Sequence, residues 1–138
     1  MRTMPAPDYE PSDDEGFMNS TQLEFFRQRL LEWKSELVRD AGETLHHLTE
    51  GNLQQPDMAD RASLETDHQI ELRTRDRERK LINKIDEALQ RIEEGTYGYC
   101  EETDEPIGLR RLIARPIATL SLEAQERHER LERTHRED

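Results

Sequence analysis

The positions of proline constrain this 138-residue chain more than any other feature of its sequence. Because a proline inside a helix removes a backbone hydrogen bond and clashes with the preceding turn, long helices need proline-free stretches. The six prolines are Pro5, Pro7, Pro11, Pro56, Pro106 and Pro116. Residues 12–55 and 57–105 therefore contain none, and the sequence allows two long helices separated near Pro56.

Apolar residues in the first stretch recur at the spacing of a helix packed along one seam. Asn19 or Ser20 supplies an N-cap, and the steps that follow alternate between three and four residues before two steps of four. The seam consists of Leu23, Phe26, Leu30, Trp33, Leu37, Ala41, Leu45 and Leu48. This pattern predicts a first helix over residues 19–50.

A second helix is predicted from residue 57 to about residue 94. Gly51, Asn52 and Pro56 end the first helix, and Asp57 is placed as the next N-cap. The second seam is Leu64, Ile70 or Leu72, Leu81, Ile85, Ala88 or Leu89, and Ile92. The two seams predict a mainly α fold, built on a long antiparallel coiled-coil hairpin over residues 19–94 with its tip near 52–62.

Three further segments flank this hairpin. Residues 1–18 combine three prolines with five acidic residues and predict a solvated, flexible tail. Residues 95–120 are rich in turn residues and predict a small zinc-finger-like globular knob, and residues 121–138 predict a C-terminal helix.

Composition excludes several classes of function. The formal net charge of −12 disfavours general or sequence-specific DNA binding and favours a protein partner with a basic cavity or rim. A hydrophobic content of 32% indicates a thin core. We find no membrane span and no apolar export signal after Met1, and one cysteine excludes an internal disulfide framework, so we expect a cytoplasmic protein.

The knob has the spacing of a four-cysteine zinc site but lacks its ligands. A Cys-x2-Cys, x17, Cys-x2-Cys frame laid from Cys100 places its other corners at Thr103, Ser121 and Ala124. Because threonine, serine and alanine are not structural zinc ligands, we expect no zinc. The preferred interpretation of Cys100 is a small, partly buried packing residue, and the alternative is a redox-sensitive thiol.

Several short motifs together resemble the DksA family of bacterial transcription factors. They are Gly-Tyr-Cys at 98–100, Ile-Gly at 107–108, Arg-Arg-Leu at 110–112, Ala-Arg-Pro at 114–116 and Asp-x-x-Asp-x-Ala at 57–62. The resemblance covers roughly residues 17–128 and is to the single-cysteine members, since three of the four zinc cysteines are absent. It implies a regulator that enters the secondary channel of RNA polymerase and acts with the alarmone ppGpp. The knob is then expected to be held by packing, with Ser121 capping the last helix and Thr103 bonding across the knuckle.

The resemblance assigns a role to the predicted tip. From the residues alone, Asp57 and Asp60 are most simply helix-capping groups, since acidic side chains suit a first helical turn. In the family, the matching acidic pair and the alanine at Ala62 reach toward the catalytic centre of the polymerase. There the two carboxylates would act as fixed negative charges and not as acid–base catalysts.

Residues 73–80 form the only clearly positive stretch, with five cations and two anions. The plain interpretation is a solvated helix face with weak charge pairs. The resemblance implies that Arg73, Arg77 and Lys80 contact the polymerase. It also implies that Leu81, Lys84 and Arg115 help to bind ppGpp, while a further basic family position is Gln125 here.

We therefore predict a transcription regulator of the stringent response that controls ribosomal RNA promoters, with no enzyme activity. The chain has no Gly-rich phosphate cradle and no catalytic or metal-binding pattern among its five histidines. A monomer without membrane association is expected. The alternatives are a helical adaptor that binds another partner, or a thiol sensor that acts through Cys100.

Overall fold

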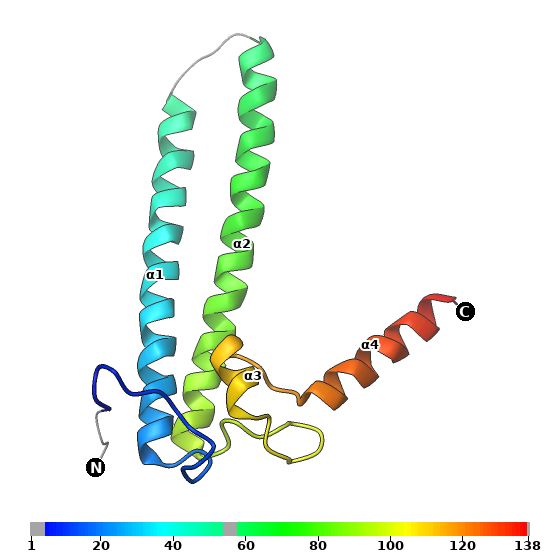
Figure 1. Ribbon diagram of the computed structural model, residues 1–138. Helices are drawn as coiled ribbons and strands as arrows, with labels where there is room; N and C mark the ends of the chain where they lie inside the picture. The colour runs from blue at the N-terminus through cyan, green and yellow to red at the C-terminus, as the bar shows by residue number, and fades with distance from the viewer. Residues whose placement is uncertain (1–4, 54–57, 138) are drawn as a thin grey trace. The chain divides into compact units, whose positions relative to one another are not determined.

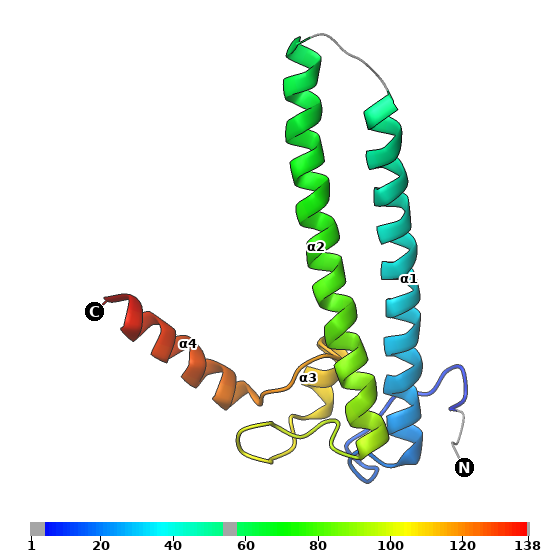
Figure 2. The same cartoon turned by 180° about the vertical axis from the view of Figure 1, so that it is seen from behind.

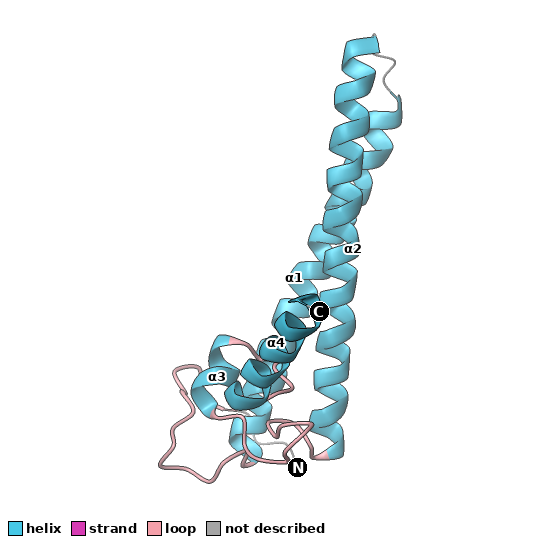
Figure 3. Ribbon diagram, turned by 90° about the vertical axis from the view of Figure 1, so that its right-hand side faces the viewer, coloured by secondary structure: helices cyan, strands magenta, loops and turns pink. Residues whose placement is uncertain are grey.

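The computed structural model describes residues 5–53 and 58–137, with side chains described over 5–43 and 62–135. Within these residues the chain forms helices α1 (Ser20–Leu53), α2 (Met58–Glu94), α3 (Leu109–Ala114) and α4 (Leu122–Glu137) (Figure 1). The described residues contain no strand, only an isolated antiparallel bridge between Tyr99 and Pro106 (Figure 3). None of the described helices is long and apolar enough to cross a membrane. The mainly helical fold class is confirmed.

The two long helices have nearly the predicted bounds. Asn19 caps α1, because its Oδ1 accepts a hydrogen bond from the Gln22 backbone N–H at 2.9 Å. This helix continues to Leu53, past the predicted end at residue 50, since glycine weakens a helix without blocking it as proline does. Helix α2 ends at Glu94 and is followed by Gly95, whose φ of 81° suits glycine.

The chain divides into two compact units, and α1 and α2 pass through both. The first unit contains residues 1–30 and 87–138, and the second contains residues 31–86. The first unit is thus larger than the predicted knob at 95–120, because the ends of α1 and α2 and the N-terminal segment share its core. It also contains α3, a six-residue helix that the sequence analysis placed only within turn-rich chain.

Aromatic rings form the centre of the first unit. The rings of Phe26 and Tyr97 lie 5.6 Å apart between centroids, and both residues are almost fully buried. The Tyr97 hydroxyl donates a hydrogen bond to the Pro116 carbonyl oxygen at 2.8 Å. Aliphatic side chains complete this core, among them Leu30, Ala88, Ile107, Leu109, Leu112, Ile117, Ala118 and Ala124. The knob is therefore a packed extension of the helix ends.

The N-terminal segment differs from the predicted solvated tail. Tyr9 packs edge-on against Phe25 with 6.0 Å between ring centroids, and Phe17 packs likewise against Tyr99 at 5.5 Å. Met18 is 9% exposed. The prediction of a solvated tail is wrong for residues 9–18, because three large apolar side chains outweigh the acidic residues between them.

The second unit consists of the paired segments of α1 and α2, which run antiparallel side by side (Figures 1 and 2). Lys34 Nζ lies 2.6 Å from Asp86 Oδ1 and joins the two helices. Leu37 and Ile85 are buried at predicted seam positions, and Trp33 is half-buried. The hairpin is therefore confirmed within this unit.

The seam prediction is wrong in the middle of α2. Ile70 and Leu72 are 56% and 52% exposed, so neither is a seam residue. A seam of partly buried positions spaced by four and three residues instead runs through Leu64, His68, Glu71, Thr74, Glu78 and Leu81. Polar residues occupy four consecutive seam positions here. The apolar residues Ile70 and Leu72 therefore indicate the wrong face of α2 as the one that packs against α1.

Candidate functional site

The basic segment of α2, residues 73–80, is divided by one internal ion-pair cluster. Asp76 accepts hydrogen bonds from Arg79 Nη2 at 2.7 Å, and its other oxygen lies 3.1 Å from Lys80 Nζ. The hydrogen bond and charge of Lys80, together with the charge of Arg79, hold the pKa of Asp76 below its ordinary value. Two of the five cations are therefore already paired within the helix.

Arg73 and Arg77 are exposed and have no ion-pair partner among the described residues. Being four residues apart on one helix, they lie on the same face. Leu81, one further step of four along α2, is half-buried. The predicted polymerase-contact set is thus divided, because Arg73 and Arg77 present unpaired charge whereas Lys80 is bonded to Asp76.

The predicted tip is described only in part. Asp57 lies outside the described residues, as does the side chain of Asp60, whose backbone belongs to the first turn of α2. Ala62 is exposed. The role of these three residues stays a prediction.

The residues predicted to bind ppGpp belong to different units. Leu81 and the exposed Lys84 lie on α2 in the second unit. Arg115, also exposed, follows α3 in the first unit, where its backbone N–H caps that helix. The combination of the three into one site stays a prediction. Gln125 holds no basic charge and its Nε2 donates to Glu129 Oε1 at 3.3 Å.

The four corners of the zinc-like frame all lie in the first unit. Cys100 is 1% exposed and Ala124 is fully buried. The Ser121 hydroxyl accepts a hydrogen bond from the Ala124 N–H at 3.2 Å and so caps α4. Thr103 Oγ1 accepts one from the Glu105 N–H at 3.3 Å. The expected cap at Ser121 is confirmed, whereas the Glu105–Thr103 bond joins residues two apart in one turn, so a bond from Thr103 across the knuckle stays a prediction.

Hydrogen bonds make the Cys100 thiol unusually acidic. Burial raises its pKa, but bonds from the Thr103 hydroxyl and from the backbone of Ser121, Thr103 and Glu102 outweigh that effect and lower the pKa to about 6. Hydrogen-bond donors therefore contact the Cys100 sulfur, which in a four-cysteine site would instead bind a metal ion together with three other ligands.

These corners do not fit a structural zinc ion. Such a site uses thiolate, imidazole or carboxylate donors in a closed set of four. Here one thiolate faces a threonine and a serine, whose hydroxyls are bonded to backbone N–H groups, and an alanine with no donor. Nowhere in the described part of the chain do three or more potential metal ligands form a cluster.

Two interactions that sequence reasoning missed join the knuckle to neighbouring helices. His128 of α4 pairs with Glu102, and Arg91 of α2 lies 3.6 Å from Glu101. Contacts between polar side chains distant in sequence carry no local pattern, so no signal in the chain predicts either pair.

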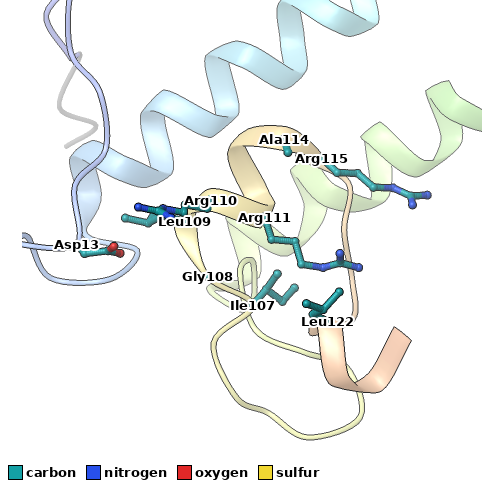
Figure 4. A pocket seen from close by; sticks show the side chains of 9 residues that line it. All are labelled: Asp13, Ile107, Gly108, Leu109, Arg110, Arg111, Ala114, Arg115 and Leu122. Carbon is teal, nitrogen blue, oxygen red and sulfur yellow. The ribbon is translucent and has the colours of Figure 1, made fainter. Parts of the chain in front are cut away.

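A groove beside α3 also escaped the sequence analysis. It has a volume of about 460 Å³ and is lined by three arginines, Arg110, Arg111 and Arg115, together with Asp13, Ile107, Gly108, Leu109, Ala114 and Leu122 (Figure 4). Arg111 Nε donates to the Leu120 carbonyl oxygen at 2.9 Å. The Arg-Arg-Leu motif was the available signal, but only as part of the family resemblance.

Taken together, these features define a helical-hairpin protein with a basic segment on α2 and a zinc-finger-like knob that lacks a zinc donor set. Residues 22–92 match the family described as DnaK suppressor protein DksA, N-terminal domain. Residues 95–130 match the prokaryotic dksA/traR C4-type zinc finger. The chain belongs to the DksA family.

Individual relatives agree with this assignment. The chain is 65% identical over 131 residues to the RNA polymerase-binding transcription factor DksA of Caulobacter vibrioides, covering 95% of this chain and 92% of the relative. It is 41% identical over 117 residues to the protein of that name from Escherichia coli, covering 85% and 78%. The solved structure of transcription factor DksA2 from Pseudomonas aeruginosa is 48% identical with a TM-score of 0.80, covering 85% of this chain and 90% of the other.

Proposed function

We propose that this protein binds RNA polymerase through the secondary channel and regulates transcription initiation together with ppGpp. The observation that carries the proposal is the 65% identity, across 95% of the chain, to a factor named for binding RNA polymerase. The exposed, unpaired Arg73 and Arg77 support it, because they give a −12 protein a local surface for an acidic partner. Ribosomal RNA promoters in the stringent response are the proposed targets.

The hairpin tip is the proposed effector element. Asp57 and Asp60 would place fixed negative charge near the catalytic centre of the polymerase, with Ala62 beside them. Such charges change initiation only if they interact differently with two states of the polymerase, since equal affinity shifts no equilibrium. The protein would therefore act on open-complex stability and would have no catalytic activity itself.

The proposed ppGpp site is shared with the polymerase. Lys84 and Arg115 are exposed cations that suit a pyrophosphate, and Arg115 is able to bind two oxygens at once. Leu81 supplies an apolar contact. Because Gln125 takes the place of a basic family residue, we expect weaker ppGpp binding than in relatives that keep that charge.

We further propose that the knob folds as a single-cysteine variant, without zinc. The support is the donor set at Cys100, Thr103, Ser121 and Ala124, in which two corners are occupied by backbone hydrogen bonds. Aromatic and aliphatic packing around Tyr97 would replace the metal as the source of stability. Metal analysis of purified protein tests this, and stoichiometric zinc would refute it.

The remaining proposals follow from the partner. A regulator that binds bacterial RNA polymerase works in the cytoplasm, and we propose that it does so as a monomer that reads no DNA sequence. A thiol sensor is the weaker alternative, because Cys100 is 1% exposed and no second cysteine exists to form a disulfide within the chain. No contact favours a helical adaptor for another partner.

Transcription in vitro from a ribosomal RNA promoter, with purified polymerase and with or without ppGpp, tests the main proposal. Wild type should change transcript yield, and Asp60→Asn should lose most of this effect while still co-eluting with core polymerase. Asp67→Asn is the matched control, since Asp67 is an exposed carboxylate on the same helix. If wild type neither binds core polymerase nor differs from Asp60→Asn, the proposal is wrong.

A further inference from the structure

The backbone of Arg115 is held by hydrogen bonds on both sides of its side chain. Its N–H donates to the Arg111 carbonyl oxygen at 2.8 Å, and its own carbonyl oxygen accepts from the Ala118 N–H at 3.0 Å. Pro116 follows and disfavours a helical conformation at Arg115, whose φ of −143° and ψ of 88° lie outside the helical region. The Arg115 side chain is exposed and extends away from α3 (Figure 4). An exposed cation thus projects from a well-held stretch of backbone.

A tyrosine distant in the sequence supplies a third hydrogen bond to this turn. The Tyr97 hydroxyl donates to the Pro116 carbonyl oxygen at 2.8 Å, although the two residues are 19 positions apart. No other hydrogen bond to that oxygen is present among the described residues. Tyr97 is 1% exposed and its ring packs on Phe26, so the hydroxyl has a fixed position. The core of the first unit therefore holds the residue next to Arg115.

The Tyr97 hydroxyl keeps its proton at neutral pH. Burial raises its pKa, although the positive charges of Arg91 and Arg29 act in the opposite direction. Because the Pro116 carbonyl oxygen only accepts hydrogen bonds, a protonated hydroxyl is the form that this contact requires. The bond is therefore present under the conditions in which ppGpp binding is measured.

Packing alone does not require this hydroxyl. A phenylalanine at position 97 would fill the same part of the core and keep the contact with the Phe26 ring. The plain alternative is that the bond only satisfies two buried polar groups, as most buried polar groups are satisfied. The position of the acceptor, on the residue after an exposed arginine, favours a role in presenting that arginine.

We infer that Tyr97 is a positioning residue for Arg115 in ppGpp binding. Its hydroxyl holds the backbone at residues 115–116 in the conformation that presents the guanidinium to a phosphate group. A group held in its binding conformation loses less conformational freedom when the ligand binds. Tyr97 itself is too buried to touch ppGpp or the polymerase. The inference rests on the proposed function for the identity of the ligand.

The test measures the ppGpp concentration that gives half of the maximal effect on transcription from a ribosomal RNA promoter, with polymerase saturated by each variant. Tyr97→Phe should raise this concentration about threefold, the effect of freeing one ordered side chain. Its affinity for core polymerase without ppGpp should equal that of wild type. In an Arg115→Ala background, Tyr97→Phe should cause no further change, because its effect passes through Arg115.

The other two tyrosines provide matched controls. Tyr99→Phe removes a hydroxyl that forms no hydrogen bond with the described residues. Tyr9→Phe removes one that donates to Glu15 Oε2 at 2.5 Å in the same unit, and so reproduces the loss of a tyrosine hydrogen bond away from Arg115. Neither variant should change the half-maximal ppGpp concentration. All variants are compared at a temperature at which circular dichroism shows them folded.

Amide hydrogen exchange gives a readout that needs neither ppGpp nor polymerase. The backbone N–H groups of Arg115 and Ala118 close the turn that the Tyr97 hydroxyl holds. Both should exchange faster in Tyr97→Phe than in wild type, because the turn opens more often. Their exchange should be unchanged in Tyr9→Phe and Tyr99→Phe.

The outcomes separate this inference from the proposed function. If wild type responds to ppGpp and Tyr97→Phe responds at the same concentration, the inference is wrong and the proposed function stands. If Tyr9→Phe weakens the response equally, or Tyr97→Phe still acts in the Arg115→Ala background, the hydroxyl contributes only to stability and the inference fails. If wild type binds polymerase but does not respond to ppGpp, the proposed ppGpp site and the inference fail together.

Discussion

The Ser121 hydroxyl accepts a hydrogen bond from the Ala124 backbone N–H at 3.2 Å, so two corners of the four-cysteine frame are bonded to each other. In a zinc finger, both corners would bind the metal. Here the serine satisfies an N–H group in the first turn of α4, and the buried alanine packs where a ligand would stand. Ser121 therefore caps a helix at a position that binds the metal in a four-cysteine zinc finger.

Removal of this cap should destabilise the protein. We expect Ser121→Ala to lower the free energy of unfolding by about 1 kcal/mol, the usual value of an N-cap. In a thermal melt followed by circular dichroism, the midpoint should fall by roughly 4 °C. Ser35→Ala is the control, because Ser35 is exposed in the middle of α1 and caps nothing, and its midpoint should not fall.

The pKa of Cys100 predicts how the stability of the first unit depends on pH. The folded pKa of about 6 lies below the ordinary value of 9.0, so folding favours the thiolate. The resulting stabilisation is complete above the unfolded pKa and is lost as the pH falls through the folded pKa. The difference in unfolding free energy between wild type and Cys100→Ala should therefore be larger at about pH 8 than at about pH 5.5.

Two measurements check this prediction. Urea unfolding of wild type and Cys100→Ala at each pH gives the difference in their free energies of unfolding. The contributions of other titrating groups cancel in this difference, because both proteins contain them. Thiolate absorbance of the folded wild type should rise through a midpoint near the pKa of about 6. A midpoint close to the ordinary value of 9.0 would show that the backbone donors do not hold the sulfur as described.

Gly98 tests whether the N-terminal segment packs on the knuckle. A Cβ at residue 98 would lie 2.8 Å from Met18 Cγ, and the φ of 92° already disfavours other residues. Gly98→Ala should therefore cost about 1 kcal/mol of backbone strain and roughly 1–3 kcal/mol of overpacking. Chemical denaturation measures the sum.

Gly95→Ala separates the two costs. Gly95 has a similar φ of 81°, but a Cβ there would meet nothing within 4 Å. Gly95→Ala should therefore be destabilised only by backbone strain. Adding Met18→Ala to Gly98→Ala should restore part of the lost stability, because it removes the side chain that the new Cβ would meet. Equal destabilisation of Gly95→Ala and Gly98→Ala would contradict the packing of Met18 on Gly98.

The polar seam of α2 should make the second unit less stable than its length suggests. Glu78 Oε2, Glu71 Oε2 and His68 Nε2 are buried and have no hydrogen-bond partner among the described residues. An unsatisfied buried polar atom costs about 1–3 kcal/mol. We expect Glu78→Leu to raise the free energy of unfolding by roughly 1 kcal/mol or more, because it removes an unsatisfied polar atom and adds apolar contact. Thermal unfolding followed by circular dichroism measures the change.

The control for the seam is Glu65→Leu, which places the same residue at an exposed position of α2. It should leave the melting midpoint nearly unchanged. If both variants stabilise equally, the gain comes from the helix propensity of leucine and not from the seam.

Arg73 and Arg77, which form no ion pair among the described residues and are predicted to contact the polymerase, should contribute more to polymerase binding than the paired Lys80. Arg77→Ala should raise the Kd for core polymerase about tenfold, as for an exposed arginine that becomes buried in an interface. Lys80→Ala should have a smaller effect, because Lys80 Nζ is already bonded to Asp76 at 3.1 Å. The reverse order in a binding titration would show that the Asp76 cluster opens on docking.

Local features were predictable from the sequence. The proline-free stretches and the three-and-four spacing determined two long helices because helix formation depends on neighbours within one turn. Caps are equally local, and both Asn19 and Ser121 act as predicted. Of the candidate site, exposed arginines on one helix face follow directly from their spacing of four.

Contacts between distant segments were decided only by the tertiary structure. Nothing near Tyr9, Phe17 or Met18 in the sequence indicates that they pack on Phe25, Tyr99 and Gly98, so the acidic, proline-rich composition of this segment predicts a solvated tail. The seam through His68, Glu71 and Glu78 was missed because periodicity was read from apolar residues, and pairing of the helices places polar residues there. The groove of Arg110 and Leu122 likewise exists only where α3, α4 and the N-terminal loop meet. The sequence determines which segments form helices, because the free energy of helix formation depends mainly on neighbouring residues. The choice of packing partners depends on which apolar surfaces, distant in the sequence, are buried from water against each other.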